Sequence, residues 1–515
     1  NMPPLTDALQ SEPKAPGRAS APLPELFPTM KKGIARENSS NSHTDSDTRE
    51  PSDDLTSDTT PLVRTHSLPQ RSLYEMLAPK AVGSPILFGW WPRAHAWCYG
   101  ELVERTTRCL PAVRPHLDWV ALPQLPEVQE LWQDWVSVHG LEITQAVWFP
   151  PLLGSIAGMN PAQATCSFVL DQVLNQNGSE SSKPKQLLFY PMYVTEDIVA
   201  DVARSGLHLI GDAEDHVLMP LSSAKAWMHP HIAEEVASHK SSNLRSALPS
   251  TVVARGPFGY VATSTSELRT AWTRLQRECP PDTPLVLKPA NGSGGCGVIL
   301  NAQEADLERF DFRTASCAIL EEMVIGCKPA QSPTIYMIGD TPCGFLADQV
   351  LSEDGATNLG NKYPSNLRTD LLPLCVEAAQ AINQVWGLKC NWGLDFVINS
   401  SGIPIIVDLN MGRPNGNLAV RMWASRSQQP LSIFTSSWFI PEDGPTIAEL
   451  TDALRSAGLL WNGANGVMVY QHFRQSTCSY AVASTSGDAA LKRITCDLQA
   501  LMQERFGIII ASLPQ

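Results

Sequence analysis

Residues Gly393–Arg413 read GLDFVINSSGIPIIVDLNMGR and form the most informative stretch of the chain. Apolar and β-branched residues dominate 394–397 and 403–409, which is typical of two strands. The small and polar residues 400–402, Ser-Ser-Gly, lie between them and favour a turn. The stretch therefore predicts a β-hairpin.

Three polar side chains interrupt the apolar runs of this hairpin: Asp395, Asp408 and Asn410. Residues two apart on a strand share a face, so Asp408 and Asn410 point the same way, and antiparallel pairing can bring Asp395 beside them. Three hard oxygen ligands suit Mg²⁺, which leaves its other positions for phosphates. The alternative is structural, with Asp395 at a strand edge and Asp408 capping a turn.

Bulk composition excludes several classes of protein. The 515 residues suggest roughly three domains. The net charge of −14 argues against nonspecific nucleic-acid binding, so no nucleic-acid partner is expected. The 12 cysteines show no CxxC pair and no zinc-ligand spacing, which indicates a reducing, cytoplasmic location. No apolar run of about 18 residues and no signal-peptide core occur, so no membrane partner is expected.

The chain divides by composition into an N-terminal tail and a structured remainder. Residues 1–75 are rich in Ser, Thr, Pro, Asp and Glu and are predicted to be disordered, because they cannot bury enough apolar surface. Truncation near Leu77 should therefore retain activity. Between 80 and 220, predicted strands (85–91, 117–122, 146–149, 185–190, 207–210) alternate with predicted helices (101–109, 127–138, 195–205). This alternation predicts a parallel α/β domain.

The remainder is assigned to two further parts, 221–330 and 331–515. A capping box at 264–267 opens a helix on which Leu268, Trp272 and Leu275 share a face. Other predicted helices cover 227–237, 302–309, 369–386 and 488–506. Predicted strands cover 285–288, 298–300, 318–322, 467–473 and 479–483, with a hairpin over 334–351. Residues 358–366, NLGNKYPSN, are expected to be a polar loop near the substrate.

A glycine-rich loop, Asn291–Gly297, lies between two of these strands. It contains G-x-G-x-x-G, but a dinucleotide-binding motif needs a helix after the loop, and a strand follows here. The Gly-Lys-Ser/Thr ending of a P-loop is also missing. The pattern predicts a hairpin tip whose backbone N–H groups can cover phosphates; a merely mobile hairpin is the alternative.

Lys288 lies in the apolar strand directly before this loop. A lysine in such a strand is costly unless its ammonium meets an anion, or unless the side chain reaches solvent. With a phosphate as that anion, Lys288→Met should fold at least as well as the parent and bind the phosphate-bearing ligand more weakly. Lys225, in the segment that leads into the predicted helix 227–237, is less distinctive. Glu321-Glu322 ends another apolar strand and is either a solvated edge or a hinge beside a nucleotide base.

The order of these features resembles the ATP-grasp superfamily. The resemblance implies an α/β protein in which a parallel α/β domain precedes a two-lobed, α+β ATP-grasp part. It implies that Lys225 and Lys288 bind ATP and that Glu321, Glu322 and Val324 form the adenine-contacting hinge. It also implies that Asp395, Asp408 and Asn410 hold Mg²⁺, with Mn²⁺ as an alternative. The implied phosphate-covering residues are Gly292, Ser293, Gly294, Gly295, Cys296 and Gly297.

Within that superfamily the chain is most similar to amino-acid ligases and peptide-synthetase-like enzymes. The resemblance implies ADP-forming ligation of a small carboxylic acid to an amine through an acyl phosphate. Two departures stand out: Asp408 occupies a position where Glu is commoner, and Gly393 one where related ligases carry Arg. Arg413 is the nearest substitute and would be catalytic together with Lys288, with Arg421 adding positive charge nearby.

Two other functions stay open at this level. One is a phosphotransferase that uses a hydroxyl acceptor, and the other is a regulatory ATP-binding protein without catalysis. The sequence does not identify the substrates. It does not identify the oligomeric state either, and a dimer is one of the states it allows.

Overall fold

The structure is a computed structural model. It describes residues 86–89, 105–114, 117–139, 146–149, 168–169, 171–172, 188–191, 208–209, 259–290, 297–313, 315, 317–327, 330–342, 346–353, 355, 357–368, 370–386, 391–411, 417–427, 429–511 and 513. The chain divides into two units, Asn1–Val63 and Arg64–Gln515, and every described residue belongs to the second. Among the described residues, no helix is both long and apolar enough to cross a membrane.

The first sheet is parallel and has the strand order β3-β2-β1-β4-β5. Its strands are β1 (Ile86–Gly89), β2 (Trp119–Pro123), β3 (Ala146–Phe149), β4 (Leu188–Pro191) and β5 (His208–Leu209). The 3-10 helix η3 (Arg105–Ala112) and helix α3 (Pro126–His139) lie between them in sequence. The predicted parallel pairing is confirmed.

The helix expected over 101–109 differs from the one observed. A 3-10 helix covers Arg105–Ala112 and contains Pro111. Proline has no N–H to donate to an α-helical carbonyl, and the β-branched Thr106 and Thr107 are poor α-helix formers. The tighter helix follows from these three residues.

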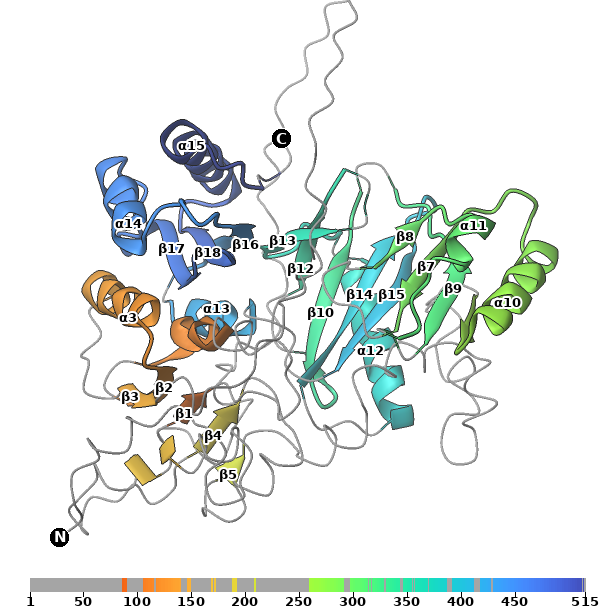
Figure 1. Ribbon diagram of the computed structural model, residues 1–515, viewed down its shortest axis with the longest axis horizontal. Coiled ribbons are helices and arrows are strands. Elements are labelled where there is room, and N and C mark those ends of the chain that lie inside the picture. Colours follow the sequence, from red (N-terminus) through yellow and green to blue (C-terminus); the bar gives the residue numbers. More distant parts are fainter. Residues whose placement is uncertain are drawn as a thin grey trace, which may run out of the picture. The chain divides into compact units, whose positions relative to one another are not determined.

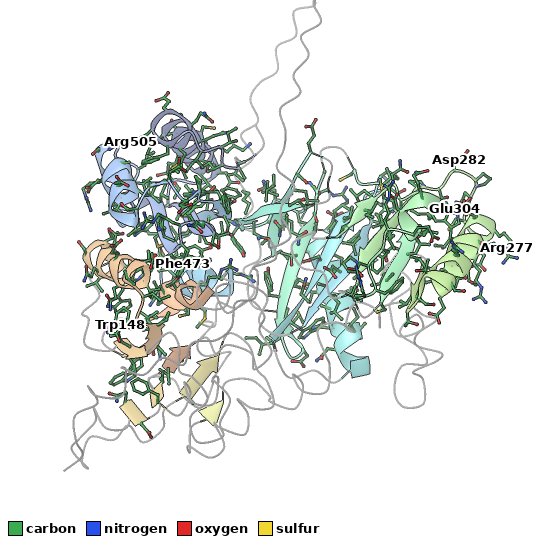
Figure 2. The ribbon with its side chains drawn as sticks, in the orientation of Figure 1. Trp148, Arg277, Asp282, Glu304, Phe473 and Arg505 are labelled. Carbon is green, nitrogen blue, oxygen red and sulfur yellow. The ribbon has the colours of Figure 1, made fainter. Side chains whose placement is uncertain are left out.

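The second sheet is antiparallel and has the order β6-β9-β7-β8. Its strands are β6 (Gly259–Ala262), β7 (Leu285–Pro289), β8 (Ile299–Leu300) and β9 (Ala318–Glu322). Helix α10 (Thr265–Glu278) lies alongside this sheet (Figure 1), and α11 (Glu304–Leu307) follows β8. Figure 2 shows Arg277 of α10 pointing away from the sheet. Strands β7 and β8 pair antiparallel, so the glycine-rich segment does connect a hairpin.

Helix α10 begins with half of the predicted capping box. The Ser264 hydroxyl accepts a hydrogen bond from the Glu267 N–H at 3.3 Å. The Glu267 carboxylate, however, accepts from the N–H of Thr263 at 2.7 Å, one residue before the position that the box requires. The predicted apolar face is confirmed, since Leu268 and Leu275 are fully buried.

The third sheet is the largest and is antiparallel, with the order β15-β14-β10-β12-β13-β16-β18-β17 and β11 beside β10. Its strands are β10 (Pro333–Ile338), β11 (Thr341–Pro342), β12 (Ala347–Leu351), β13 (Asn358–Tyr363), β14 (Asn391–Ile398), β15 (Pro404–Met411), β16 (Ser432–Phe439), β17 (Asn465–His472) and β18 (Thr477–Ser484). The associated helices are α12 (Leu372–Trp386), α13 (Asn417–Ala424), α14 (Ile447–Ser456) and α15 (Asp488–Phe506).

The two faces of this sheet differ in character. On one face, α12 contacts β10 and β14 (Figure 1), over an apolar cluster that includes Ile335, Leu394 and Leu409. Side chains alternate between the two faces of a sheet, so the neighbours of these residues along each strand point to the opposite face. Because Asp395, Asp408 and Asn410 are among them, the candidate site lies on the face away from α12.

The prediction of a polar loop over 358–366 is wrong, because Asn358–Tyr363 is strand β13. Asn361 and Lys362 are buried there, although such residues usually indicate a loop. The Lys362 ammonium lies 2.7 Å from the Asp488 carboxylate at the start of α15 and donates to Asn366 Oδ1 at 2.8 Å. The Asp488 carboxylate makes the buried charge tolerable, and because it is distant in sequence a local pattern does not contain it.

A continuous hydrophobic cluster joins the N-terminal sheet to the last third of the chain. It contains Leu110, Val120 and Trp132 from η3, β2 and α3 together with Leu454 and Val467 from α14 and β17. The predicted parts 80–220 and 331–515 therefore share one core.

Candidate active site

The predicted hairpin is confirmed, and its register places the two carboxylates directly opposite each other. Asp395 on β14 pairs with Asp408 on β15, and Gly393 pairs with Asn410. The Asn410 amide donates from Nδ2 to Asp395 Oδ2 at 2.9 Å. All three polar residues thus meet on one face. Both aspartates lie within strands, so neither the strand-edge nor the turn-cap alternative describes them.

A β-bulge lies directly beside the carboxylates. The pairing shifts after Asp395, so that Phe396 pairs with Ile406 and Val407 has no partner of its own in the ladder. The extra residue keeps Ile406 in the apolar cluster while Asp408 lies on the opposite face. It also turns the Val407 carbonyl to a different partner, Lys288, whose Nζ donates to it at 2.8 Å.

Lys288 brings strand β7 of the four-stranded sheet to this hairpin. Its ammonium lies 2.6 Å from Glu321 Oε1 on β9, and both side chains are largely buried, 12% and 4% exposed. Burial lowers the pKa of Lys288, but the negative charges of Glu321, Asp408 and Asp395 together outweigh burial, so the pKa is raised above its usual value. Lys288 is a cation in this site.

The segment after Glu321 also connects the two sheets. Glu322 ends β9 opposite Leu285 and is half-buried. Val324 follows, also half-buried, and the Cys327 N–H then donates to the Ile398 carbonyl on β14 at 2.8 Å. The predicted hinge residues therefore lie where the chain passes from the four-stranded sheet to the hairpin.

Strand β10 adds Thr334 to the row of polar residues. Thr334 pairs with Asp395, which pairs with Asp408 on the next strand, so the three side chains lie in a row on one face. Thr334 is 1% exposed, and its hydroxyl has no hydrogen-bond partner among the residues that the structure describes. Such buried hydroxyls are uncommon in native proteins.

Tyr336 is the next residue of β10 on the same face. It pairs with Gly393, and a Cβ at Gly393 would lie 3.1 Å from the tyrosine ring. The absence of a side chain at Gly393 thus lets the ring lie over the backbone next to Asn410. The Arg421 guanidinium of α13 lies 4.8 Å from the centroid of this ring and 5.3 Å from that of Tyr363.

Arg421 was expected to add positive charge near the site, and it does lie over this face. It is 1% exposed, however, so it is a buried cation between two aromatic rings rather than a surface group. Cation–π contacts of this kind are strongest when desolvated. Arg421 supplies fixed positive charge from within the protein.

The donor set fits a hard divalent cation. Asp395, Asp408 and Asn410 offer only oxygen ligands, which Mg²⁺ prefers over nitrogen or sulfur. Among the described residues, no three His, Cys, Asp or Glu side chains form a metal cluster, and the candidate set has two carboxylates and one amide. Two carboxylates in direct register repel each other unless positive charge lies nearby, and a cation between them would relieve this.

Several predicted site residues lie outside the described part of the chain: Lys225, Arg413, Gly292, Ser293, Gly294, Gly295 and Cys296. Gly297 is described and has φ of +78°, a conformation that favours glycine. A Cβ there would lie 3.1 Å from the Pro289 ring, so the end of the loop packs closely against β7.

Sequence reasoning missed Thr334, Tyr336 and the Val407 bulge. The run 333–338 shows the alternation of a strand, which could have indicated that Thr334 and Tyr336 share a face. That β10 lies beside β14, in the register Thr334–Asp395, depends on long-range pairing. No local pattern contains that information.

No family model matches the chain, and no curated protein matches it. Among solved structures, the chain is similar to an N5-carboxyaminoimidazole ribonucleotide synthetase in complex with ADP, with a TM-score of 0.49 and 11% identity over 82% of this chain and 98% of that chain. The corresponding Staphylococcus aureus synthetase with ADP has a TM-score of 0.46 and 11% identity, over 81% and 97%. The biotin carboxylase domain of Hydrogenobacter thermophilus 2-oxoglutarate carboxylase, with MgADP and bicarbonate, has 0.45 and 13%, over 84% and 91%. Since all three scores are below 0.5, the function proposed below rests on this chain's own residues.

Proposed function

We propose that the protein is an ATP- and Mg²⁺-dependent ligase that joins a carboxylic acid to an amine. The observation that carries the proposal is the meeting of Lys288 with the carboxylate hairpin. A buried lysine from one sheet contacts the Val407 carbonyl, one residue from Asp408, and its pKa responds to both aspartates. A cation beside paired carboxylates is an arrangement suited to a nucleotide triphosphate with its metal.

In this proposal the residues divide by role. Lys288 pairs with phosphate oxygens, and the backbone N–H groups of the glycine-rich loop cover them. Glu321 orients Lys288, at 2.6 Å, and lies at the start of the hinge that would contact the base. Asp395, Asp408 and Asn410 would hold Mg²⁺, which neutralises charge on the transferring phosphoryl group when bound.

The reaction follows in two steps. A carboxylate oxygen of the acid attacks the γ-phosphorus, the bond from that phosphorus to the ADP oxygen breaks, and an acyl phosphate forms. The amine nitrogen then attacks the acyl carbon, the bond to phosphate breaks, and the nitrogen loses a proton as the amide forms. The protein contributes positioning and charge stabilisation in both steps. Arg413, three residues after Asn410, and the buried Arg421 would stabilise the anionic acid and its acyl phosphate.

Hydroxylamine trapping tests the proposed reaction class. The protein is incubated with ATP, Mg²⁺ and a panel of amino acids and other carboxylic acids, with hydroxylamine as the amine. A ligase forms a hydroxamate together with equal amounts of ADP and inorganic phosphate. ADP with a phosphorylated hydroxyl product and no inorganic phosphate would instead identify a phosphotransferase.

Asp408→Asn tests the metal assignment. Because its Oδ1 already accepts from the Leu409 N–H at 2.9 Å, an isosteric amide fits the strand, and the melting temperature should hardly change. Mn²⁺ binding, measured by electron paramagnetic resonance with ADP present, should weaken at least about tenfold, and ADP formation should cease. Asp370→Asn is the matched control, since Asp370 is exposed and pairs with Arg368. Parent-like Mn²⁺ affinity in Asp408→Asn would refute the assignment.

A further inference from the structure

We infer that Thr334 is a positioning residue of the metal site: its hydroxyl donates a hydrogen bond to an oxygen in the metal's own shell, next to Asp395. This inference rests on the proposed function and adds to it a residue from a third strand. It follows from three observations on β10 and β14.

The first observation is the register. Thr334 lies directly opposite Asp395, and Asp395 lies directly opposite Asp408. In antiparallel sheets, side chains of residues directly opposite each other have Cβ atoms about 4.5–5.5 Å apart on the same face. The threonine hydroxyl is therefore within reach of an oxygen bound beside the Asp395 carboxylate.

The second observation is the state of that hydroxyl. Thr334 is 1% exposed, and no described residue offers its Oγ1 a hydrogen bond. A buried hydroxyl without a partner costs free energy, whereas a valine of the same shape would not. Folding alone therefore gives no reason for threonine at this position.

The third observation is the contrast with Ser332, the residue directly before β10. The Ser332 hydroxyl lies 2.9 Å from the Phe396 carbonyl and 3.0 Å from Gln349 Oε1. A buried hydroxyl next to β10 can thus be satisfied within the protein, as that of Ser332 is. Thr334 differs in lying beside the carboxylates, which points to a partner supplied with the metal.

A hydrogen-bond donor that does not bind the metal itself acts by fixing the position of an oxygen that does. Asp395 already accepts from Asn410 Nδ2 at 2.9 Å, so one side of its carboxylate is oriented by β15. A hydrogen bond from Thr334 would order the opposite side, towards β10. Loss of an outer-shell partner typically weakens metal binding by about 10- to 100-fold.

The test compares Thr334→Val and Thr334→Ser with the full-length parent. Two quantities are measured: the urea midpoint of unfolding without metal or nucleotide, and the Mn²⁺ dissociation constant by electron paramagnetic resonance. We expect Thr334→Val to unfold at the same or a higher urea concentration and to bind Mn²⁺ about tenfold more weakly. Thr334→Ser keeps the hydroxyl and should bind Mn²⁺ as the parent does.

Titrations with and without ADP identify the shell oxygen. Weaker Mn²⁺ binding in both titrations indicates a metal-bound water, and weaker binding only with ADP indicates a phosphate oxygen. Thr495→Val is the control, since Thr495 is buried in α15 and its hydroxyl is bonded to the Leu491 carbonyl at 2.8 Å. That variant should lower the urea midpoint without changing Mn²⁺ affinity.

Parent-like Mn²⁺ affinity in Thr334→Val would overturn the inference. A clear loss of stability in this variant, or its failure to fold, would also overturn it, because the hydroxyl would then serve the fold. Asp408→Asn separates this failure from that of the proposed function. If Asp408→Asn loses Mn²⁺ and Thr334→Val does not, only the role of Thr334 is wrong. If both variants bind Mn²⁺ like the parent, the site itself is wrong.

Discussion

At the scale of single residues, the Lys288–Glu321 pair changes what a substitution should do. Lys288→Met was expected to fold at least as well as the parent, with phosphate as the anion that lysine meets. In the structure the anion is Glu321, 4% exposed, at 2.6 Å. Removing one partner of a buried ion pair leaves the other charge uncompensated and typically costs about 3–5 kcal/mol.

We therefore predict that Lys288→Met lowers the free energy of unfolding by a few kcal/mol. The double variant Lys288→Met with Glu321→Gln should recover part of that loss, because Glu321 no longer carries an uncompensated charge. Urea unfolding of the two single variants and the double variant measures the coupling. Additive losses would show that the two residues do not interact. ATP binding should be weak in every variant that lacks Lys288.

The sequence predicted that Lys288 needs an anion but not which anion. Lys288 pairs with Ile319 across β7 and β9, and Glu321 is two residues further on the same face. Such diagonal neighbours are within reach of a long side chain. Identifying Glu321 required the register of two strands about thirty residues apart in the chain, which a local pattern does not contain.

At the scale of secondary-structure elements, strand β13 and helix α15 are joined by the Lys362–Asp488 ion pair, at 2.7 Å. The two partners differ in exposure, with 7% of the Lys362 side chain and 39% of the Asp488 side chain accessible to solvent. Hydrogen bonds from Lys362 to Asn366 and from Ser432 to Asp488 complete the cluster. The pair thus holds the start of α15 against the sheet.

We predict that Asp488→Asn destabilises the protein more than Lys362→Met does. The first change leaves a buried ammonium without its carboxylate, whereas the second leaves a carboxylate that water can reach. The free energies of unfolding of the two variants, measured in urea, test the order. Arg455→Met is a surface control, because Arg455 forms an exposed pair with Asp452 and should change stability little. A larger loss in Lys362→Met would contradict the prediction.

Elements with a simple alternating or helical pattern were predicted well from the sequence. The β14–β15 hairpin, β3 and β9 agree closely with expectation, and so does α15. Strand β13 was missed because the carboxylate that pairs with its buried Lys362, that of Asp488, lies far away in the chain. The elements β16 and α14 were not anticipated at all, although α14 begins with a capping box at Thr446 and Glu449 that sequence inspection could have found.

At the scale of the whole molecule, the shared hydrophobic cluster determines which truncations the protein tolerates. Leu110, Val120 and Trp132 are buried in the same cluster as Leu454 and Val467. Arg426 adds polar contacts between the two regions, donating to the carbonyls of Pro111 and Val113 at 2.7 and 2.8 Å. The N-terminal sheet and the C-terminal strands are therefore expected to unfold together.

We predict that a protein beginning at residue 221 fails to fold, since the apolar surface of β17 and α14 would lose its cover. It should bind the dye ANS and aggregate, whereas a protein beginning at Leu77 should remain folded and active. Size-exclusion chromatography and urea unfolding of the two truncated proteins distinguish them. A monomeric, cooperatively unfolding protein from residue 221 would show that the shared core is dispensable.

The contact of Lys288 with the hairpin is made to a backbone carbonyl, that of Val407, at the β-bulge. Every residue type carries that carbonyl, so a substitution of Val407 would leave the acceptor itself in place. An insertion or deletion in β15 would be different, because it would alter the bulge and with it the direction of the carbonyl. For this contact, the number of residues between Ile406 and Asp408 therefore matters more than the identity of the residue between them.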